Sequence, residues 1–281
     1  MFLATVCTTT IVGAGHYLSF TSEFGTREIV VGWDLIWPGL GYCAAVLGIL
    51  GAHEMGHYVM CRRYNVDATL PFFLPFPPVL SLFGTLGAVI KIREPFPTRT
   101  ALFDMGVAGP IAGFVVLVPL LFWGMGLSNV MAVPPDMDGW TLGEPLLFRL
   151  AAYIHFGHVP DGYSVNIHPV VFASWFGMLA TAFNLLPFGQ LDGGHLTYAI
   201  LRERSRFFSL ATVAAAVAMC FVSLNWLLMT LVMLAMLVLL GPRHPRVLDE
   251  QEPLDARRYA VAALAVLILI VCFTPVPLDP L

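Results

Sequence analysis

The chain alternates between long apolar stretches and short polar segments. Seven apolar stretches approach or exceed the roughly 20 residues that a helix needs to cross a bilayer. They cover residues 2–20, 38–61, 104–127, 168–187, 207–223, 225–240 and 259–275, and the sixth is short. This pattern predicts an all-α polytopic membrane protein with about six to seven transmembrane helices. The first stretch has neither the basic start nor the small-residue cleavage site of a removable signal peptide, so we count it as a span.

The segment between the second and third stretches follows a different pattern. Residues 71–78 contain four prolines, which exclude a regular helix there. Residues 81–92 then combine Gly84 and Gly87 with apolar and β-branched side chains, a pattern typical of a short hairpin or a re-entrant loop. Backbone of this kind at membrane depth needs protein or water to satisfy its polar groups. We therefore expect a re-entrant or β-hairpin segment here.

Composition agrees with a membrane protein. The chain is 58% hydrophobic and 11% charged, with a mean hydropathy of +0.81, whereas soluble domains average about 25% charged residues. The net charge of −4 predicts no nucleic-acid partner. The five cysteines lie singly in apolar segments, which predicts small buried side chains and neither a disulfide framework nor a thiolate metal site.

The basic residues predict an orientation. With the N-terminus inside and seven spans, the inner loops carry twelve of the 14 Lys and Arg residues, and the outer loops carry only Arg27 and Arg149. The outer loop at 128–166 is too small for an added globular domain and contains a short helical pattern near 144–156.

A motif with chemical content lies near the inner end of the second stretch: His53-Glu54-Met55-Gly56-His57. Residues four apart share one face of a helix, so His53 and His57 can both direct an imidazole nitrogen at one ion. Glu54 then lies beside the metal, where a carboxylate can take a proton from metal-bound water. The alternative is that these groups are buried and hydrogen-bonded to one another, but ionisable groups inside a membrane are expensive and by default functional. The donor set, His and carboxylate without thiolate, favours Zn²⁺.

A second motif follows the fourth stretch, where Asn184-Leu185-Leu186-Pro187 leads into Leu191-Asp192-Gly193-Gly194-His195. Two adjacent glycines let the backbone turn tightly after Asp192. Its carboxylate can complete a three-ligand zinc site that leaves the fourth position for water. His195 competes for this role, and an ordinary helix N-cap is the structural alternative for Asp192. The presence of the first motif favours the metal role.

Two other polar residues lie in apolar surroundings. Asn184 either donates a hydrogen bond to a substrate carbonyl and its developing oxyanion or forms a structural bond between helices. Asp104, at the start of the third stretch, is expected to cap its helix. Gly106, Gly109 and Gly113 follow it and suit close helix packing.

Together these residues resemble the site-2 protease family of intramembrane zinc metalloproteases, peptidase family M50. The resemblance rests on the two motifs and on the intervening stretches Gly84-Thr85-Leu86-Gly87 and Gly106-Val107-Ala108-Gly109-Pro110, and it covers roughly residues 38–200. It implies a three-span catalytic core with His53, His57 and Asp192 as ligands of one Zn²⁺ and Glu54 as the acid/base. It also favours Asp192 over His195 as the third ligand.

Relatives in this family commonly carry an inserted peptide-binding domain of the PDZ type or a C-terminal nucleotide-sensing domain. Neither fits in this chain. We therefore expect the re-entrant segment, with Gly84 and Gly87 as candidate contacts, to select the substrate. A strand beside the metal can hold an unwound substrate by main-chain pairing, and the alternative is an apolar loop packed on the bundle.

The sequence thus predicts three regions and one activity. Residues 1–37 form the first span and an external loop, 38–206 the catalytic core, and 207–281 C-terminal transmembrane helices without a catalytic role. The predicted activity is an intramembrane zinc metalloendopeptidase that cleaves a transmembrane helix of a membrane-protein substrate near the cytoplasmic side of the lipid bilayer. The absence of a visible transit sequence favours a bacterial inner membrane.

Two alternatives to this activity stay open. One is a non-catalytic membrane metal-binding protein or transporter, for which polar groups spread along several spans and a repeated half are expected. In this chain the polar groups gather at two motifs instead. The other is a pseudoprotease that holds membrane helices without cutting them, in which Glu54 has no evident task.

Overall fold

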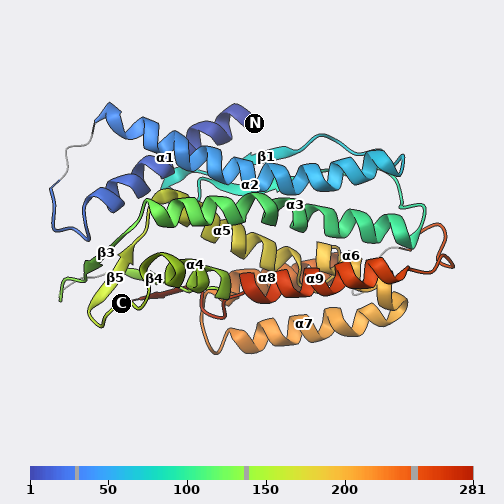
Figure 1. Cartoon of the computed structure of the whole chain (residues 1–281). Coiled ribbons are helices and arrows are strands. Elements are labelled where there is room, and N and C mark those ends of the chain that lie inside the picture. The colour runs from blue at the N-terminus through green and yellow to red at the C-terminus, as the bar shows by residue number, and fades with distance from the viewer. Residues whose placement is uncertain (29–31, 136–138, 242–245, 281) are drawn as a thin grey trace.

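The computed structural model describes residues 1–28, 32–135, 139–241 and 246–280. Most of this is helical (Figure 1). The helices are α1 (Phe2–Thr21), α2 (Ile36–Arg63), α3 (Arg99–Gly126), α4 (Leu146–Phe156), α5 (Pro169–Asn184), α6 (Asp192–Leu201), α7 (Ser205–Met219), α8 (Trp226–Leu240) and α9 (Ala256–Cys272). Short strands pair antiparallel, β1 with β2, β3 with β5 and β4 with β6. They are β1 (Phe72–Pro75), β2 (Thr85–Val89), β3 (Asn129–Ala132), β4 (Trp140–Leu142), β5 (Tyr163–Asn166) and β6 (Leu278–Pro280).

Each of the seven apolar stretches overlaps a helix, but the helices differ in length. Within the described part of the chain, only Trp33–Arg63 and Arg99–Gly126 are long and apolar enough to cross a bilayer by length and composition. Helices α5, α7, α8 and α9 have 15 to 17 residues, fewer than the roughly 20 that a perpendicular span needs. The structure therefore supports a helical fold with two candidate spans, and the count of six to seven stays a prediction.

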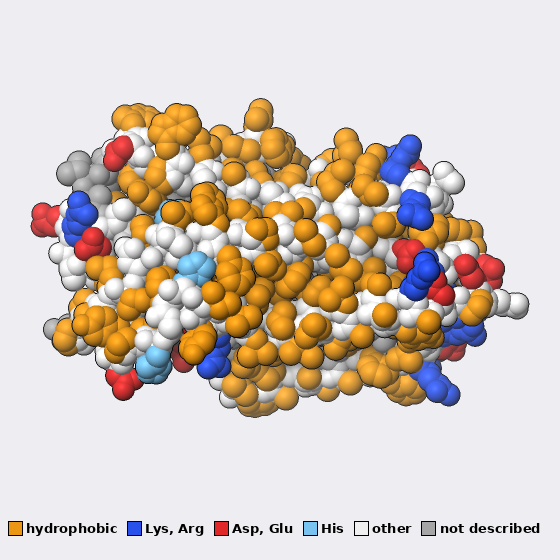
Figure 2. Space-filling model, in the orientation of Figure 1, with side chains coloured by type: hydrophobic (Ala, Val, Ile, Leu, Met, Phe, Trp, Pro, Cys, Tyr) orange, Lys and Arg blue, Asp and Glu red, His pale blue; other side chains and the backbone are white. Residues whose placement is uncertain are grey.

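Helices α2 and α3 run side by side in opposite directions at the centre of the bundle, and α5 packs against both (Figure 1). Several of the largest fully buried side chains lie on these three helices, including Tyr42, Leu117, Trp175 and Met178. Figure 2 shows charged side chains gathered mainly at the two ends of the bundle, with an apolar surface between them. Such a distribution suits a bundle whose middle lies in lipid, where charged side chains are costly.

Helix α3 begins earlier than its apolar pattern predicts. It starts at Arg99 because Thr98 caps it, with the Thr98 hydroxyl accepting a hydrogen bond from the Ala101 amide at 3.1 Å. Asp104 is therefore inside the helix, and the expectation that it caps α3 was wrong. Its carboxylate instead accepts two hydrogen bonds from the Arg258 guanidinium of α9, both at 2.7 Å.

The segment between α2 and α3 forms an antiparallel hairpin whose register runs from the Phe72–Val89 pair to the Pro75–Thr85 pair, with an irregularity before Pro75. The hairpin packs along α1 and contacts α2. At its turn Gly84 has φ +75°, and the Thr8 hydroxyl of α1 donates to the Gly84 carbonyl at 2.7 Å. Glycine is needed here for two reasons. Its positive φ is one that other residues rarely adopt, and a Cβ would lie 2.7 Å from the Thr8 carbonyl oxygen.

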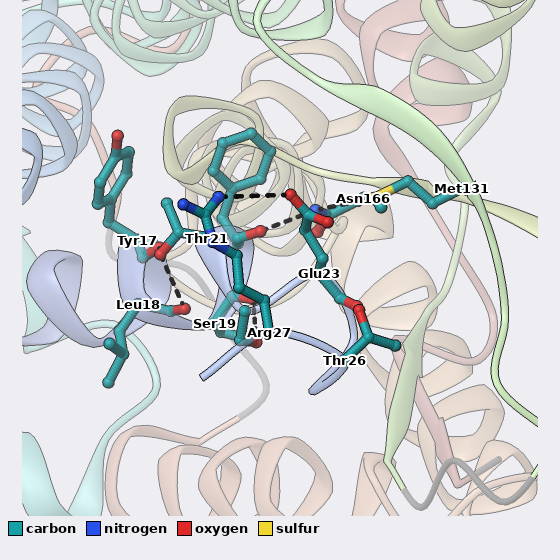
Figure 3. Close-up of polar contacts among 11 residues, drawn as sticks. Tyr17, Leu18, Ser19, Thr21, Glu23, Thr26, Arg27, Met131 and Asn166 are labelled. Atoms are coloured by element: carbon teal, nitrogen blue, oxygen red, sulfur yellow. Dashed lines mark hydrogen bonds and ion pairs between the residues drawn. The ribbon is translucent and has the colours of Figure 1, made fainter. Parts of the chain in front are cut away.

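The opposite end of α1 is joined to the strand pair β3–β5. The Asn166 amide of β5 donates to the Phe20 carbonyl at 2.8 Å and lies 3.8 Å from the Met131 sulfur of β3 (Figure 3). One turn further on, Arg27 and Glu23 form an exposed ion pair at 3.7 Å. The Asn166 contact joins α1 to the segment of residues 128–166, which includes α4 near the predicted position.

Candidate metal centre

Helix α2 places the two histidines of the first motif one turn apart on its buried side. The Nε2 atoms of His53 and His57 lie 3.1 Å from each other, and both residues are buried. The two rings meet edge to face, with centroids 4.8 Å apart. The i, i+4 spacing thus brings two imidazole nitrogens to one point, as the helical period requires.

The third group comes from the start of α6. The Asp192 carboxylate lies between the histidines, with Oδ2 at 3.1 Å from His53 Nε2 and Oδ1 at 3.3 Å from His57 Nε2. These three residues form a cluster of potential metal ligands within 4.8 Å of one another. His195, the rival third ligand, packs against Gly106 of α3 instead.

The glycines after Asp192 act differently from the prediction. They do not form a tight turn, because Gly193 and Gly194 lie in the first turn of α6 and the left-handed residue is Gly189, with φ +52°. Their role is close packing. A Cβ at Gly193 would lie 2.0 Å from the Leu185 carbonyl oxygen, and one at Gly194 would lie 2.3 Å from the Gly189 carbonyl oxygen. The absent side chains let the start of α6 fold back onto the end of α5.

A row of glycines on α3 provides the other wall of the site. A Cβ built at Gly109 would lie 2.1 Å from His57 Nε2, and one at Gly113 would lie 3.2 Å from the His53 Cβ. Gly106 contacts α6 in the same way, through the His195 Cβ and the Asp192 carbonyl. The sequence predicts close helix packing from this row, but it does not show that the groups admitted by the glycines are the ligand side chains.

The donor set fits a zinc ion on three observations. His57 Nδ1 lies 2.8 Å from the Met105 carbonyl, which can only accept, so Nδ1 carries the proton and Nε2 keeps its lone pair for the site. Asp192 Oδ2 is buried and has no hydrogen-bond partner among the described groups, although His53 Nε2 lies 3.1 Å away. The two imidazole nitrogens, 3.1 Å apart, are close to the about 3.3 Å that separates two ligand atoms of a tetrahedral zinc with bonds of about 2.0 Å, and one carboxylate oxygen lies near each of them. The sequence does not predict the contact of Met105 with His57, because Met105 acts through its backbone carbonyl.

Two further predicted residues border the cluster. Glu54 is buried beside His53 on α2, and its carboxylate lies next to the backbone amide of Ile90, directly after β2. The Asn184 amide nitrogen, at the end of α5, lies 3.4 Å from His53 Nε2. The predicted substrate contacts Gly84 and Gly87 lie on the hairpin, where Gly84 packs against α1 and a Cβ at Gly87 would meet no atom within 4 Å. The structure thus groups five of the seven predicted site residues around one point, and the roles of all seven stay predictions.

Comparison with protein families matches residues 41–228 of the chain to the model of peptidase family M50. The chain belongs to peptidase family M50. The match extends beyond the roughly 38–200 inferred from the motifs and includes α7 and the start of α8.

This M50 chain is similar to several plant proteins. It is 30% identical over 244 residues to the probable zinc metalloprotease EGY1, chloroplastic, of Oryza sativa subsp. japonica. The aligned residues cover 83% of this chain and 40% of that protein. It is 29% identical over 262 residues to EGY2 of O. sativa subsp. indica, another probable chloroplastic zinc metalloprotease, with coverage of 88% and 45%. The chain thus spans less than half the length of these relatives. No solved structure matches it. Because the relatives are named chloroplastic, they give no support to the predicted bacterial inner membrane, which rested only on the absence of a visible transit sequence.

Proposed function

We propose that this M50 protein is an intramembrane zinc metalloendopeptidase that cleaves a transmembrane segment of a membrane protein near the cytoplasmic side. The observation that carries the proposal is the convergence of His53, His57 and Asp192 on one point, with the Glu54 carboxylate buried beside them. The M50 match and the names of the relatives support the same activity.

His53 and His57 from α2 and Asp192 from α6 would hold the zinc. When bound, zinc supplies a polarised scissile carbonyl and an acidified water at the fourth position. Glu54 accepts the proton of the attacking water and passes it to the amine of the leaving group. The Asn184 amide, 3.4 Å from His53 Nε2 at the edge of the ligand cluster, would donate a hydrogen bond to the developing oxyanion.

The hairpin would present the substrate as an extended strand. A transmembrane helix hides its carbonyls in internal hydrogen bonds, so the scissile peptide must unwind before attack. Strand β2 runs directly into Ile90, whose backbone lies against the Glu54 carboxylate, so main-chain pairing along this strand would bring an unwound segment to the catalytic groups.

The arrangement of the loops supports the proposed side of the membrane. The connections after α2 and before α9 lie at one end of the bundle, and those after α1 and α3 lie at the other (Figure 1). The first end carries most of the basic residues of the chain, which favours the cytoplasmic side or its equivalent. Because α2 ends at Arg63, His57 lies less than two turns from that end.

The experiment that tests the proposal measures bound zinc and peptide-bond cleavage in the same preparations of the full chain. Glu54→Gln should keep about one zinc per chain and lose cleavage, because the amide cannot accept a proton. Asp192→Ala should lose both zinc and cleavage. If Asp192→Ala retained its zinc, Asp192 would be removed as a ligand. If Glu54→Gln cleaved as fast as the wild type, the catalytic role of Glu54 would be wrong. Transport of metal across the membrane by the Glu54→Gln variant would favour the transporter alternative.

A further inference from the structure

An apolar hollow lies between α2, α3 and the start of α9, and it has no part in the proposed catalysis. It has a volume of about 700 Å³, within the roughly 300–1,000 Å³ typical of small-molecule sites. Its walls are small and apolar side chains of α2 and α3, including Ala52, Val59, Ala108, Ile111 and Ala112. We call it the α2–α3 groove.

The groove is short compared with a membrane-spanning helix. Its lining on α2 runs from Ala52 to Met60, about 12 Å at 1.5 Å per residue. The hydrocarbon core of a bilayer is about 30 Å thick, or about 15 Å per leaflet. The groove is therefore no deeper than one leaflet, which suits the acyl chain of a lipid and is too short for a transmembrane helix.

The mouth of the groove is charged and lies at the start of α9. Its lining there consists of Asp104, Asp255, Arg257 and Arg258. Arg258 is shared between the two carboxylates, with Asp104 at 2.7 Å and Asp255 at 3.1 Å. Within the described chain Arg257 forms no ion pair, so its charge is available at the mouth.

Further positive charge lies nearby. Arg63 is four residues after Val59 and so continues the groove-lining face of α2. The start of α9 adds the partial positive charge of a helix N-terminus. Figure 2 shows blue and red side chains together at the end of the molecule where α2 ends and α9 begins. The four charged residues of the lining sum to zero, so the positive excess at this end of the groove comes from Arg63, and Arg257 is the lining cation that pairs with no described carboxylate.

We infer that the α2–α3 groove binds one anionic phospholipid, with an acyl chain between α2 and α3 and the phosphate at Arg257. An apolar hollow of this size at hydrocarbon depth is filled by lipid in a membrane, and basic pockets between helices select anionic headgroups. The bound lipid would support the ligand helices from behind, because Gly56 and Ala108 of the groove wall neighbour His57 and Gly109 in the chain. This inference depends on membrane insertion and not on proteolysis.

The test is lipid binding to the detergent-purified full chain by native mass spectrometry, with phosphatidylglycerol and phosphatidylcholine of identical acyl chains. The wild type should retain phosphatidylglycerol in preference. Arg257→Gln should weaken phosphatidylglycerol about fivefold and leave phosphatidylcholine unchanged, because one phosphate contact is lost. Arg204→Gln is the matched control: Arg204 is also exposed and unpaired in the described structure, but it lies outside the groove, and this variant should bind as the wild type does.

A second variant tests the apolar part. Ala112→Phe fills the groove, so it should reduce binding of both lipids while the midpoint of thermal unfolding stays near that of the wild type. Equal retention of the two lipids by the wild type would overturn the inference, as would unchanged binding by Ala112→Phe. So would a loss of substrate cleavage in Ala112→Phe with lipid binding intact, because the groove would then receive a protein helix.

Discussion

Gly109 is the residue where the smallest change should damage the metal centre most. A methyl group there would lie 2.1 Å from the His57 ring nitrogen, so the imidazole must move. We expect Gly109→Ala to lower zinc affinity by about 10- to 100-fold, the range seen when support for a metal ligand is lost. The measurement is zinc affinity of the purified chain by competition with a chelator.

The control for this prediction is Gly48→Ala. Gly48 lies in the interior of α2, and a Cβ there meets no atom within 4 Å, so the variant should keep its zinc and gain up to about 1 kcal/mol from helix propensity. Equal zinc affinity of Gly109→Ala and Gly48→Ala would show that the glycine row of α3 does not position His57.

Substitution of Asn184 tests whether this residue acts on the reaction or on the binding of the metal. Its amide nitrogen lies 3.4 Å from His53 Nε2, at the outer limit of a hydrogen bond, so it contributes little to holding that ring. We expect Asn184→Ala to reduce kcat by about 10²-fold, as for the loss of one oxyanion donor, with zinc content unchanged. Zinc loss in this variant would instead assign Asn184 to ligand support.

The sequence predicts some of these residues much better than others. The proximity of His53 and His57 follows from the helical period alone, because residues four apart on a helix lie on the same face. The proximity of Asp192 depends on how α6 folds back over α5, which a local pattern does not determine; only the family resemblance favoured it over His195. The Met105 carbonyl has no side-chain signature, so its contact with His57 was not predictable.

The hairpin is the element whose position we expect to control substrate use. Gly84→Ala places a methyl group 2.7 Å from the Thr8 carbonyl oxygen at a residue with φ +75°, which costs about 1–3 kcal/mol of strain and moves the hairpin away from α1. We expect KM for a membrane substrate to rise about fivefold or more, with zinc content unchanged, in a reconstituted cleavage assay.

Gly15→Ala is the control for this element. Gly15 lies in α1 with no atom within 4 Å of a built Cβ, so this variant should cleave as the wild type does. Two results would count against the hairpin as the substrate-binding element: unchanged KM in Gly84→Ala, or a loss of zinc there.

Elements were predictable where their signal is local. Hydropathy places the long helices, and proline together with glycine indicates the β1–β2 hairpin, whose strands are near in sequence. It cannot indicate the β4–β6 pair, which joins residues 140–142 to residues 278–280, because short strands that pair across most of the chain carry no recognisable local pattern. The end of a helix also differs from the end of its apolar stretch where a capping residue sets it, as Thr98 does for α3.

At the scale of the whole molecule, a polar cluster links α9 to α3 and to the end of α2. The carboxylate of Asp104 on α3 accepts hydrogen bonds from Arg258 on α9 and from the Tyr64 hydroxyl at the end of α2. These helices carry no predicted catalytic residue, yet α9 packs on α3 and α5, which hold the glycine row and Asn184. A role for α9 in keeping the ligand helices together follows from this contact.

The strength of that attachment can be measured against a matched ion pair in the same chain. The Arg258–Asp104 and Arg246–Glu203 pairs both have N–O distances of 2.7 Å, but the side chains of the first are 23% and 22% exposed and those of the second 76% and 70%. Water screens the exposed pair, so Arg246→Gln should change stability by less than about 0.5 kcal/mol. Arg258→Gln removes a bidentate, partly buried contact and leaves Asp104 without its cation, so we expect a loss of about 1–3 kcal/mol in the free energy of unfolding and a lower midpoint of thermal unfolding.

The double variant Asp104→Asn, Arg258→Gln should recover part of this loss, since neither charge then remains unpaired. Equal midpoints for the two arginine variants would show that the Arg258–Asp104 contact stabilises the fold no more than an exposed ion pair does.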